Sequence, residues 1–386
     1  MKTAIRTIAT MTLVLIMASC QNKDARMLTV INEDGTCSRE YTFHSTQQWL
    51  GIPQEEDYDS IVDRTWERSW SVLGADSVRY PVPLTEAQLD SMQAQDLSKP
   101  LGNMLMVHAK KDYKSVEEMS AQIYRPENHH LVKVEGIKVS SQLEKRFKWF
   151  YTDFTFTETF AYEDSTLFPI PLSQFLSADT ASFWFTGQPD LTRYLSGAEQ
   201  KEMLDAIEKK VSQWSNANWF KEICNIIVAN YDKVQNPPIS KERFISISDS
   251  LVMQPCVLNP KEGDYLENGG FDALLHDVFQ SDAYTQFLKS YDGGLGEYNQ
   301  LFLFSTNYDL VMPGRVLDAG MGEYDGEVIH YSRLGAERMI PGAYTISATS
   351  RVTNVWAFFV TLLIILLAIG SLLWRRKRRG KSEGCD

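Results

Sequence analysis

The feature that most constrains this chain is an uninterrupted apolar segment near its end. Residues 355–374 read VWAFFVTLLIILLAIGSLLW and include no charged side chain. At a rise of about 1.5 Å per residue, a helix of this length is about 30 Å long, which matches the hydrocarbon core of a bilayer. A buried core helix is the alternative, but such helices are shorter and lack a basic segment behind them. We therefore predict one transmembrane helix at 355–374.

Both ends of this predicted span carry residues that suit a membrane surface. Trp356 and Trp374 lie where interfacial aromatic side chains are enriched. Basic clusters mark the cytoplasmic side of a span, so we expect a basic cytoplasmic tail at 375–386 and the rest of the chain on the other side. The tail begins with Arg375, Arg376, Lys377, Arg378 and Arg379.

The start of the chain has the pattern of a secretory signal. A basic beginning and a short apolar run over 8–18 precede small residues, as in signal peptides. Met17-Ala18-Ser19-Cys20 resembles the lipobox of bacterial lipoproteins, in which the cysteine thiol receives diacylglycerol. The resemblance implies a lipoprotein signal peptide at 1–19, a lipidated Cys20 and a tether at 20–26. An ordinary signal peptide with an incidental cysteine is the alternative.

A lipid and a span together predict a bacterial inner-membrane protein whose residues 27–352 are periplasmic. The span decides the membrane, because its insertion is effectively irreversible and acyl chains hold less firmly. If both anchors share one membrane, the first and last strands lie near the same surface, where they could pair in one sheet.

The charge of the chain limits its partners. The formal net charge is −12, although the tail after Trp374 is strongly basic, so the remainder is more acidic than the whole. A negative field of this kind repels nucleic acid and anionic head groups. The charge therefore favours a neutral, apolar or cationic partner, or none, and no nucleic acid. Together with the two anchors, this predicts membrane lipid as the anchor and a lipid or protein partner in the envelope.

The outer part of the chain shows strand patterns at its two ends. Asp34-Gly35 between two apolar runs predicts a β-hairpin close to residue 27. Residues 104–108 read as a strand, and Ser115 with Glu118 begins a helix that continues to about Ile123. Trp66 and Trp70 fit one face of a helix but would also suit a strand.

The most aromatic stretch lies within residues 147–162. Its aromatic side chains occupy odd positions up to Tyr151 and even positions from Phe154, and alternation of this kind indicates a strand. The change of phase near Thr152-Asp153 predicts a bulge or bend in one long strand. Core packing is the favoured role, and a ligand-facing aromatic platform is the alternative. The candidates for that platform are Trp149, Tyr151, Phe154 and Phe156.

A helical pattern follows an irregular segment at 166–194. Ser196 with Glu199 forms a capping box, and we expect one helix to about Trp214 and a second at 218–233 within a helical insertion at 190–291. Strands return at about 301–312, and a last strand at 343–350 leads to a juxtamembrane link at 351–354. The fold class is α+β, with a mostly antiparallel sheet from 27–163 and 300–352, a helical insertion and one C-terminal transmembrane helix.

Motifs for chemistry are missing from the sequence. It contains no HEXXH, GxSxG, P-loop or CxxC pattern, so we predict no catalytic residue, no metal site and no cofactor. A catalytic arrangement assembled in space is the alternative. Cys224 and Cys256 could pair, or remain as buried free thiols.

Several short motifs of this chain match a known group of proteins. They are Val30-Ile31-Asn32-Glu33-Asp34-Gly35-Thr36, Met312-Pro313-Gly314, Asp325-Gly326, Ala348-Thr349-Ser350-Arg351 and the basic tail. With these motifs the layout resembles a group of bacterial lipoproteins with a C-terminal span and, more distantly, the LppM-like lipoproteins. That resemblance implies a small outer α+β domain that binds lipid or glycolipid, from which the helical segment at 190–291 departs.

We predict a non-enzymatic envelope module that binds a lipid, peptide or protein. The alternatives are a scaffold or signalling subunit that acts through its span, and an envelope enzyme.

Overall fold

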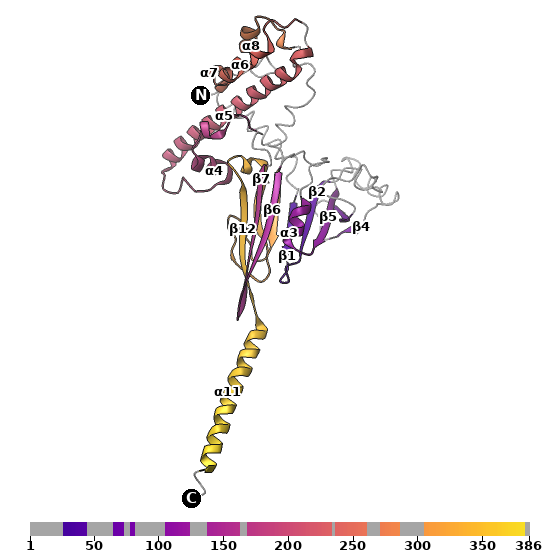
Figure 1. Ribbon diagram of the computed structural model, residues 1–386, viewed down its shortest axis with the longest axis vertical. Coiled ribbons are helices and arrows are strands. Elements are labelled where there is room, and N and C mark those ends of the chain that lie inside the picture. The colour runs from indigo at the N-terminus through magenta and orange to yellow at the C-terminus, as the bar shows by residue number, and fades with distance from the viewer. Residues whose placement is uncertain are drawn as a thin grey trace.

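The computed structural model has two β-sheets in its middle, a helical part at one end and one long helix leaving the other end (Figure 1). The predicted signal peptide, Cys20 and most of the tether lie outside the described residues, as do 301–304 and 286–291. The structure describes residues 26–44, 65–72, 78–81, 105–123, 137–162, 168–233, 236–260, 271–285 and 305–382.

The first sheet has eight strands in the order β10-β11-β8-β1-β2-β5-β3-β4. Strand β1 pairs in parallel with β8, while its other neighbour β2 is antiparallel, so the sheet is mixed and the prediction of a mostly antiparallel sheet holds only in part. The strands are β1 (Arg26–Ile31), β2 (Cys37–His44), β3 (Glu67–Val72), β4 (Tyr80–Pro81), β5 (Leu105–Tyr113), β8 (Ser305–Val311), β10 (Glu323–Tyr324) and β11 (Ile329–Gly335).

The second sheet is antiparallel and has the order β6-β7-β12-β9. Its strands are β6 (Ile137–Lys148), β7 (Tyr151–Tyr162), β9 (Arg315–Asp318) and β12 (Tyr344–Thr353). The chain crosses from the first sheet to the second at the predicted Met312-Pro313-Gly314 turn. Gly314 adopts a φ of 73° there, in the left-handed region that favours glycine.

One apolar core fills the space between the two sheets. Leu310 of the first sheet and Phe156 of the second are both fully buried, and helix α3 (Val116–Ile123) adds Met119. The last strand buries Tyr344, Ile346 and Ala348 on one face, as its alternation predicts.

The first and last strands do not pair with each other. They lie in different sheets, and β1 runs towards the same end as β8, because the two are parallel. Strand β8 ends at the turn before Arg315, which pairs with Arg351 near the start of the long helix. Arg26 therefore begins β1 at the end away from that helix, whereas β12 ends next to it, so the start of β1 and the end of β12 do not lie near one surface as expected.

The aromatic stretch forms a hairpin instead of one bent strand. Lys148 of β6 pairs with Tyr151 of β7, so Trp149 and Phe150 make a two-residue turn. Across such a turn, odd residues of β6 face the same side as even residues of β7, so the change of phase from Phe147 to Phe154 needs no bulge. Tyr151 lies on the opposite face of β7 from Phe154. Both Trp66 and Trp70 are buried, and Trp70 lies in strand β3, which decides the open choice in favour of a strand.

The helical part begins earlier than expected. Helix α4 (Ala178–Thr186) occupies a segment predicted to be irregular, where Ser177 caps its start and Gly187 its end. Helix α5 (Gly197–Asn230) starts at the predicted capping box and is continuous through the expected break before Asn218. The side-chain amide of Asn218 donates to Ile170 O and to Trp214 O, one turn earlier in α5, so this polar residue is satisfied inside the helix and does not end it. Within the described residues this part also contains the helices α6 (Lys241–Val252), α7 (Pro255–Leu258) and α8 (Asp272–Phe279). Short 3-10 turns lie at η4 (Leu172–Gln174), η5 (Tyr231–Lys233) and, in the sandwich, η7 (Ala336–Met339). Cys224 and Cys256, at α5 and α7, are both free, as is Cys37.

Helix α11 (Val355–Ser382) begins at the predicted span and continues into the basic residues. It is the one described helix long and apolar enough to cross a membrane, and 6% of its most apolar window is buried. Single-pass membrane anchoring is therefore consistent with the structure. The predicted link at 351–354 is shorter than expected, because β12 extends to Thr353 and leaves only Asn354 between strand and helix.

Candidate functional site

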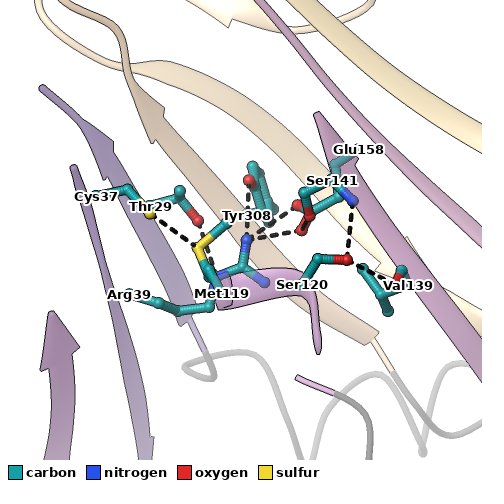
Figure 2. A network of polar contacts seen from close by, with 9 residues as sticks. All are labelled: Thr29, Cys37, Arg39, Met119, Ser120, Val139, Ser141, Glu158 and Tyr308. Atoms are coloured by element: carbon teal, nitrogen blue, oxygen red, sulfur yellow. Dashed lines mark hydrogen bonds and ion pairs between the residues drawn. The ribbon is translucent and has the colours of Figure 1, made fainter. Parts of the chain in front are cut away.

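A buried ion pair joins the two sheets inside the sandwich. Arg39 of β2 donates from Nη2 to Glu158 Oε1 and Oε2 of β7 at 2.8 and 3.0 Å, and both side chains have no exposed area. Figure 2 shows Thr29, Ser141 and Tyr308 around the pair. Ser141 Oγ donates to Glu158 at 2.7 Å, and Arg39 Nε donates to Thr29 Oγ1 at 3.0 Å.

This buried network has the character of a structural link rather than a reaction site. No substrate can reach groups without exposed area, and burial raises the pKa of the nearby Cys37 thiol to about 12, which keeps it protonated and unreactive. Burial likewise raises the pKa of Tyr308 well above its usual value. Arg39 Nη1 has no hydrogen-bond partner among the described residues, so Glu158 is the one group with a negative charge that the Arg39 guanidinium is shown to bond.

Sequence reasoning missed this pair, although the alternation of each strand carries a signal for it. Arg39 lies between Cys37 and Tyr41, and Glu158 between Phe156 and Phe160, so each charge falls on the apolar face of its strand. Two opposite charges on apolar faces predict a buried ion pair, because an unpaired buried charge is too unfavourable.

A second network has the connectivity of a serine–histidine–acid triad. Ser71 Oγ lies 2.8 Å from His108 Nε2, and His108 Nδ1 lies 3.3 Å from Glu40 Oε1. Burial opposes ionisation of Glu40, but hydrogen bonds from His108 and Arg79 outweigh it and lower the pKa to about 2. Thr42 Oγ1 also contacts His108 Nδ1 at 3.1 Å.

The geometry of this second network argues against hydrolysis. Ser71 and His108 are 0% and 2% exposed, so no carbonyl can approach Ser71 Oγ in this arrangement. Three residues on three separate strands leave no spacing motif, which explains why the sequence did not indicate them. We interpret the network as buried polar side chains whose hydrogen-bonding groups are paired with one another.

A third cluster lies at the surface of the first sheet. His330 Nδ1 is 2.7 Å from Asp309, directly across the β11–β8 pair, and Nε2 is 3.1 Å from Asp325. Among the described residues, no three His, Cys, Asp or Glu side chains are placed so that they could hold one metal ion together, and we describe this cluster as two ion pairs on one histidine.

The pKa of His330 is expected to lie above its usual 6.5, because the hydrogen bonds to Asp309 and then Asp325 favour the charged ring. A raised pKa in the folded state stabilises the fold fully below pH 6.5, and this contribution is lost as pH rises through the folded-state pKa. We expect at most about 1 kcal/mol, because the His330 side chain is 43% exposed. NMR titration of the ring should show a lower midpoint in Asp309→Asn, and an unchanged midpoint would contradict the assignment.

The most unusual site is the joint between the sandwich and α11. Asn354 is the single residue between β12 and α11, and the β6–β7 turn lies against it. The Asn354 N–H donates to Phe150 O at 2.9 Å, and its side-chain amide donates to Lys148 O at 2.9 Å and Trp149 O at 3.3 Å. Thr152 Oγ1 donates to Asn354 Oδ1 at 3.1 Å. Asn354 thus bonds to four of the five residues between Lys148 and Thr152 at the hairpin tip, and Tyr151 is the exception.

Aromatic side chains extend this joint along the first two turns of α11. The Trp149 indole N–H donates to Thr361 Oγ1 at 2.8 Å, and its ring meets Trp356 edge-on at 5.4 Å between centroids. Phe147 stacks on Trp356, and Phe150 lies 4.8 Å from Phe358. We call Phe147, Trp149, Phe150, Trp356 and Phe358 the aromatic collar.

Charged side chains surround the hairpin just above the collar. Arg351 binds Asp153 through two nitrogens at 2.6 and 3.2 Å, and Lys148 lies 3.2 Å from the same carboxylate. The hydrogen bond from Arg351 lowers the pKa of Asp153. The Arg351 guanidinium also lies 3.8 Å from the centroid of the Tyr151 ring, a cation–π contact.

The structure separates the residues singled out from the sequence. Trp149 and Tyr151 lie at the joint, but Phe154 and Phe156 are 3% and 0% exposed in the sandwich core and cannot face a ligand. Trp356 belongs to the collar, while Trp374, Arg375 and Arg376 lie exposed at the far end of α11. Lys377, Arg378 and Arg379 continue the same helix. The chain matches no protein-family model, no curated protein and no solved structure.

Proposed function

We propose that this protein is a non-enzymatic, single-pass membrane protein that presents its helical part to a protein partner at a fixed height and orientation. As the sequence predicts, its bulk lies in the periplasm and its basic tail in the cytoplasm. Lipidation of Cys20 remains part of this proposal and rests on the lipobox resemblance alone.

The joint at Asn354 is the observation that carries the proposal. A module that only needs tethering is served by a flexible linker, whereas this chain passes from β12 to α11 through one residue whose polar groups are bonded. The helical part lies at the other end of the sandwich from α11 (Figure 1). A rigid connection between these two ends fixes where the helical part is held relative to the bilayer.

The helical part also has the surface that a protein partner needs. Tyr194 and Leu195, between α4 and α5, are 89% and 36% exposed, and Ile245 and Met253 at α6 are 47% and 45% exposed. Aromatic and large apolar side chains are enriched where proteins bind one another. We therefore place the partner contact on this part of the chain.

Insertion of a flexible Gly/Ser linker between Asn354 and Val355 is expected to reduce partner contact strongly. Full-length protein carrying a photo-crosslinking side chain at Tyr194 should capture one partner in cell membranes. With the linker inserted, the helical part samples a large volume and its effective concentration at a membrane-bound partner falls, so the crosslink yield should drop by about tenfold or more.

The matched control is the same linker inserted at Gly326, in the exposed β10–β11 turn, which leaves the joint intact. That variant should crosslink like the unmodified chain. An unchanged yield after insertion at Asn354 would refute presentation at fixed geometry. Loss of the crosslink on replacing 362–374 by polyleucine would instead support a scaffold that acts through its span.

A further inference from the structure

The tip of the β6–β7 hairpin presents large apolar side chains directly beside α11. Phe147, Trp149 and Phe150 are 59%, 43% and 39% exposed, although a two-residue turn at a protein surface usually carries small polar residues. They continue the apolar surface of α11, because Phe147 and Trp149 contact Trp356 and Phe150 contacts Phe358. An apolar patch continuous with a membrane span has lipid as its natural occupant.

The length of the apolar helix places this tip at a depth within the bilayer. Residues 355–374 of α11 match a hydrocarbon core of about 30 Å, whereas the stretch from Thr361 to Trp374 covers only about 20 Å. Matching the apolar length to the hydrocarbon core therefore puts Val355, not Thr361, at the edge of that core. Trp149 bonds to Thr361, six residues further along α11, so the tip lies up to about 9 Å below this edge.

The backbone carbonyl groups of the tip have hydrogen-bond partners within the protein, as an apolar lipid environment requires. The carbonyl groups of the two central residues in a tight turn normally bond to water, and a carbonyl group left without a partner in lipid is strongly unfavourable. The carbonyls of Lys148, Trp149 and Phe150 all accept hydrogen bonds from Asn354. A turn that only faced water would gain little from this arrangement.

Basic side chains gather around the hairpin one layer above the tip, and we call them the basic belt. The belt opposes the acidic character of the whole chain, whose net charge is −12. Arg146 and Lys148 have 68% and 43% of their side chains exposed. The basic members are Lys145, Arg146, Lys148, Arg315 and Arg351, and the acidic members are Glu144 and Asp153, with Glu33 and Asp34 of the β1–β2 turn next to Lys145.

From these observations we propose that the β6–β7 hairpin is a second membrane-contacting element, which inserts into the leaflet where α11 begins. The aromatic collar begins with Trp356 at the boundary between head groups and acyl chains, where Trp side chains are favoured, and reaches into the acyl chains with Trp149. The basic belt binds the phosphates of anionic phospholipids, which a local positive surface attracts even on an acidic protein. The expectation that the negative chain avoids anionic head groups therefore does not extend to this end.

The test measures the depth of a nitroxide label on Phe150→Cys in the full chain, reconstituted in phosphatidylcholine vesicles with and without phosphatidylglycerol. Cys20, Cys256 and Cys385 are replaced by Ser. Cys37 and Cys224 are kept, because both are buried and burial raises the pKa of each thiol to about 12. The label should be accessible to oxygen and about tenfold less accessible to a water-soluble nickel complex than a label on Tyr194→Cys, which is 89% exposed in the helical part.

Each outcome decides one part of the proposal. Equal nickel accessibility at Phe150→Cys and Tyr194→Cys, repeated with the label on Phe147→Cys, would overturn insertion of the tip. If the tip inserts, phosphatidylglycerol should deepen the label, and this gain should disappear in Lys145→Gln/Arg146→Gln. A depth that does not respond to phosphatidylglycerol would overturn the assignment of the basic belt to anionic lipid. None of these readouts depends on a protein partner, so they stand apart from the proposed function.

Discussion

Replacing Glu158 by Gln is expected to lower the free energy of unfolding by about 3–5 kcal/mol. The substitution keeps the shape of the side chain but removes the charge opposite Arg39, which has no exposed area and whose Nη1 has no partner among the described residues. An arginine does not escape by losing its proton, so its charge stays buried and uncompensated in the folded state. Denaturant unfolding of the full chain in detergent, followed by circular dichroism, measures the loss.

An exposed ion pair provides the matched control for this prediction. Lys110 and Asp112 lie 3.6 Å apart with 46% and 76% of their side chains exposed, so Asp112→Asn should change stability by less than about 1 kcal/mol. The double variant Arg39→Leu/Glu158→Leu should recover most of the loss, because apolar replacement of a whole buried pair is often neutral. If Glu158→Gln unfolds no more easily than Asp112→Asn, the pair does not hold the sheets together as argued.

The parts of the fold that could be predicted are those in which neighbouring residues determine the structure. The apolar run of α11, the Ser196–Glu199 capping box and the alternation before Ser350 each depend on contacts within a few residues. The hairpin at Asp34-Gly35 was likewise predicted, although its loop spans Asn32 to Thr36 and only Gly35 has a positive φ.

The parts that could not be predicted depend on pairing between distant segments. No local pattern states that β1 pairs in parallel with β8, whose residues lie some 280 positions further along the chain. The sorting of strands into two sheets follows from the same distant choices. The prediction of an irregular segment at helix α4 was wrong for a different reason. The aromatic residues of this segment suit a strand or a loop equally well, and only the caps at Ser177 and Gly187 identify the helix.

The candidate site at the joint was visible in the sequence only as unconnected pieces. The sequence indicates Trp149 and Tyr151 by their rings, and Trp356 by its place at a membrane surface. The turn between β6 and β7 has neither Gly nor Asn, so nothing marked it as a turn. Without that turn, Asn354 was an unremarked residue in a presumed link, although it bonds to the whole hairpin tip.

The helical part and the sandwich have separate cores, which predicts that they lose structure independently. The helical core packs α5 against α6, α7 and α8, and it shares no residue with the core between the sheets. The described contact between the two parts runs through α4 and η7 instead, where Arg338 lies against Thr186 O at 3.5 Å. The residues of the helical core are Ala217, Phe220, Ile223, Cys224, Ile227, Tyr231, Phe244, Leu251, Val252, Val257, Phe271, Leu275, Phe279 and Tyr284.

Phe220→Ala is therefore expected to destabilise the helical part by about 3–5 kcal/mol and to leave the sandwich unchanged. Phe220 is fully buried and packs on Phe271 at 5.0 Å between ring centroids, so its loss leaves a cavity in the helical core. Hydrogen-exchange mass spectrometry should show amide protection falling by at least about 100-fold in α5 and α6 but not in β7.

Phe156→Ala is the mirror control for this prediction, because Phe156 is fully buried in the core between the sheets. It should reduce protection in β7 and β12 and spare α5. Equal losses in both parts after either substitution would show that they unfold as one unit. Independent unfolding would mean that the rigid joint at Asn354 positions the helical part only while α4 stays packed on η7. The contact between α4 and η7, and not the helical core, would then fix the orientation of the partner-binding surface relative to the membrane.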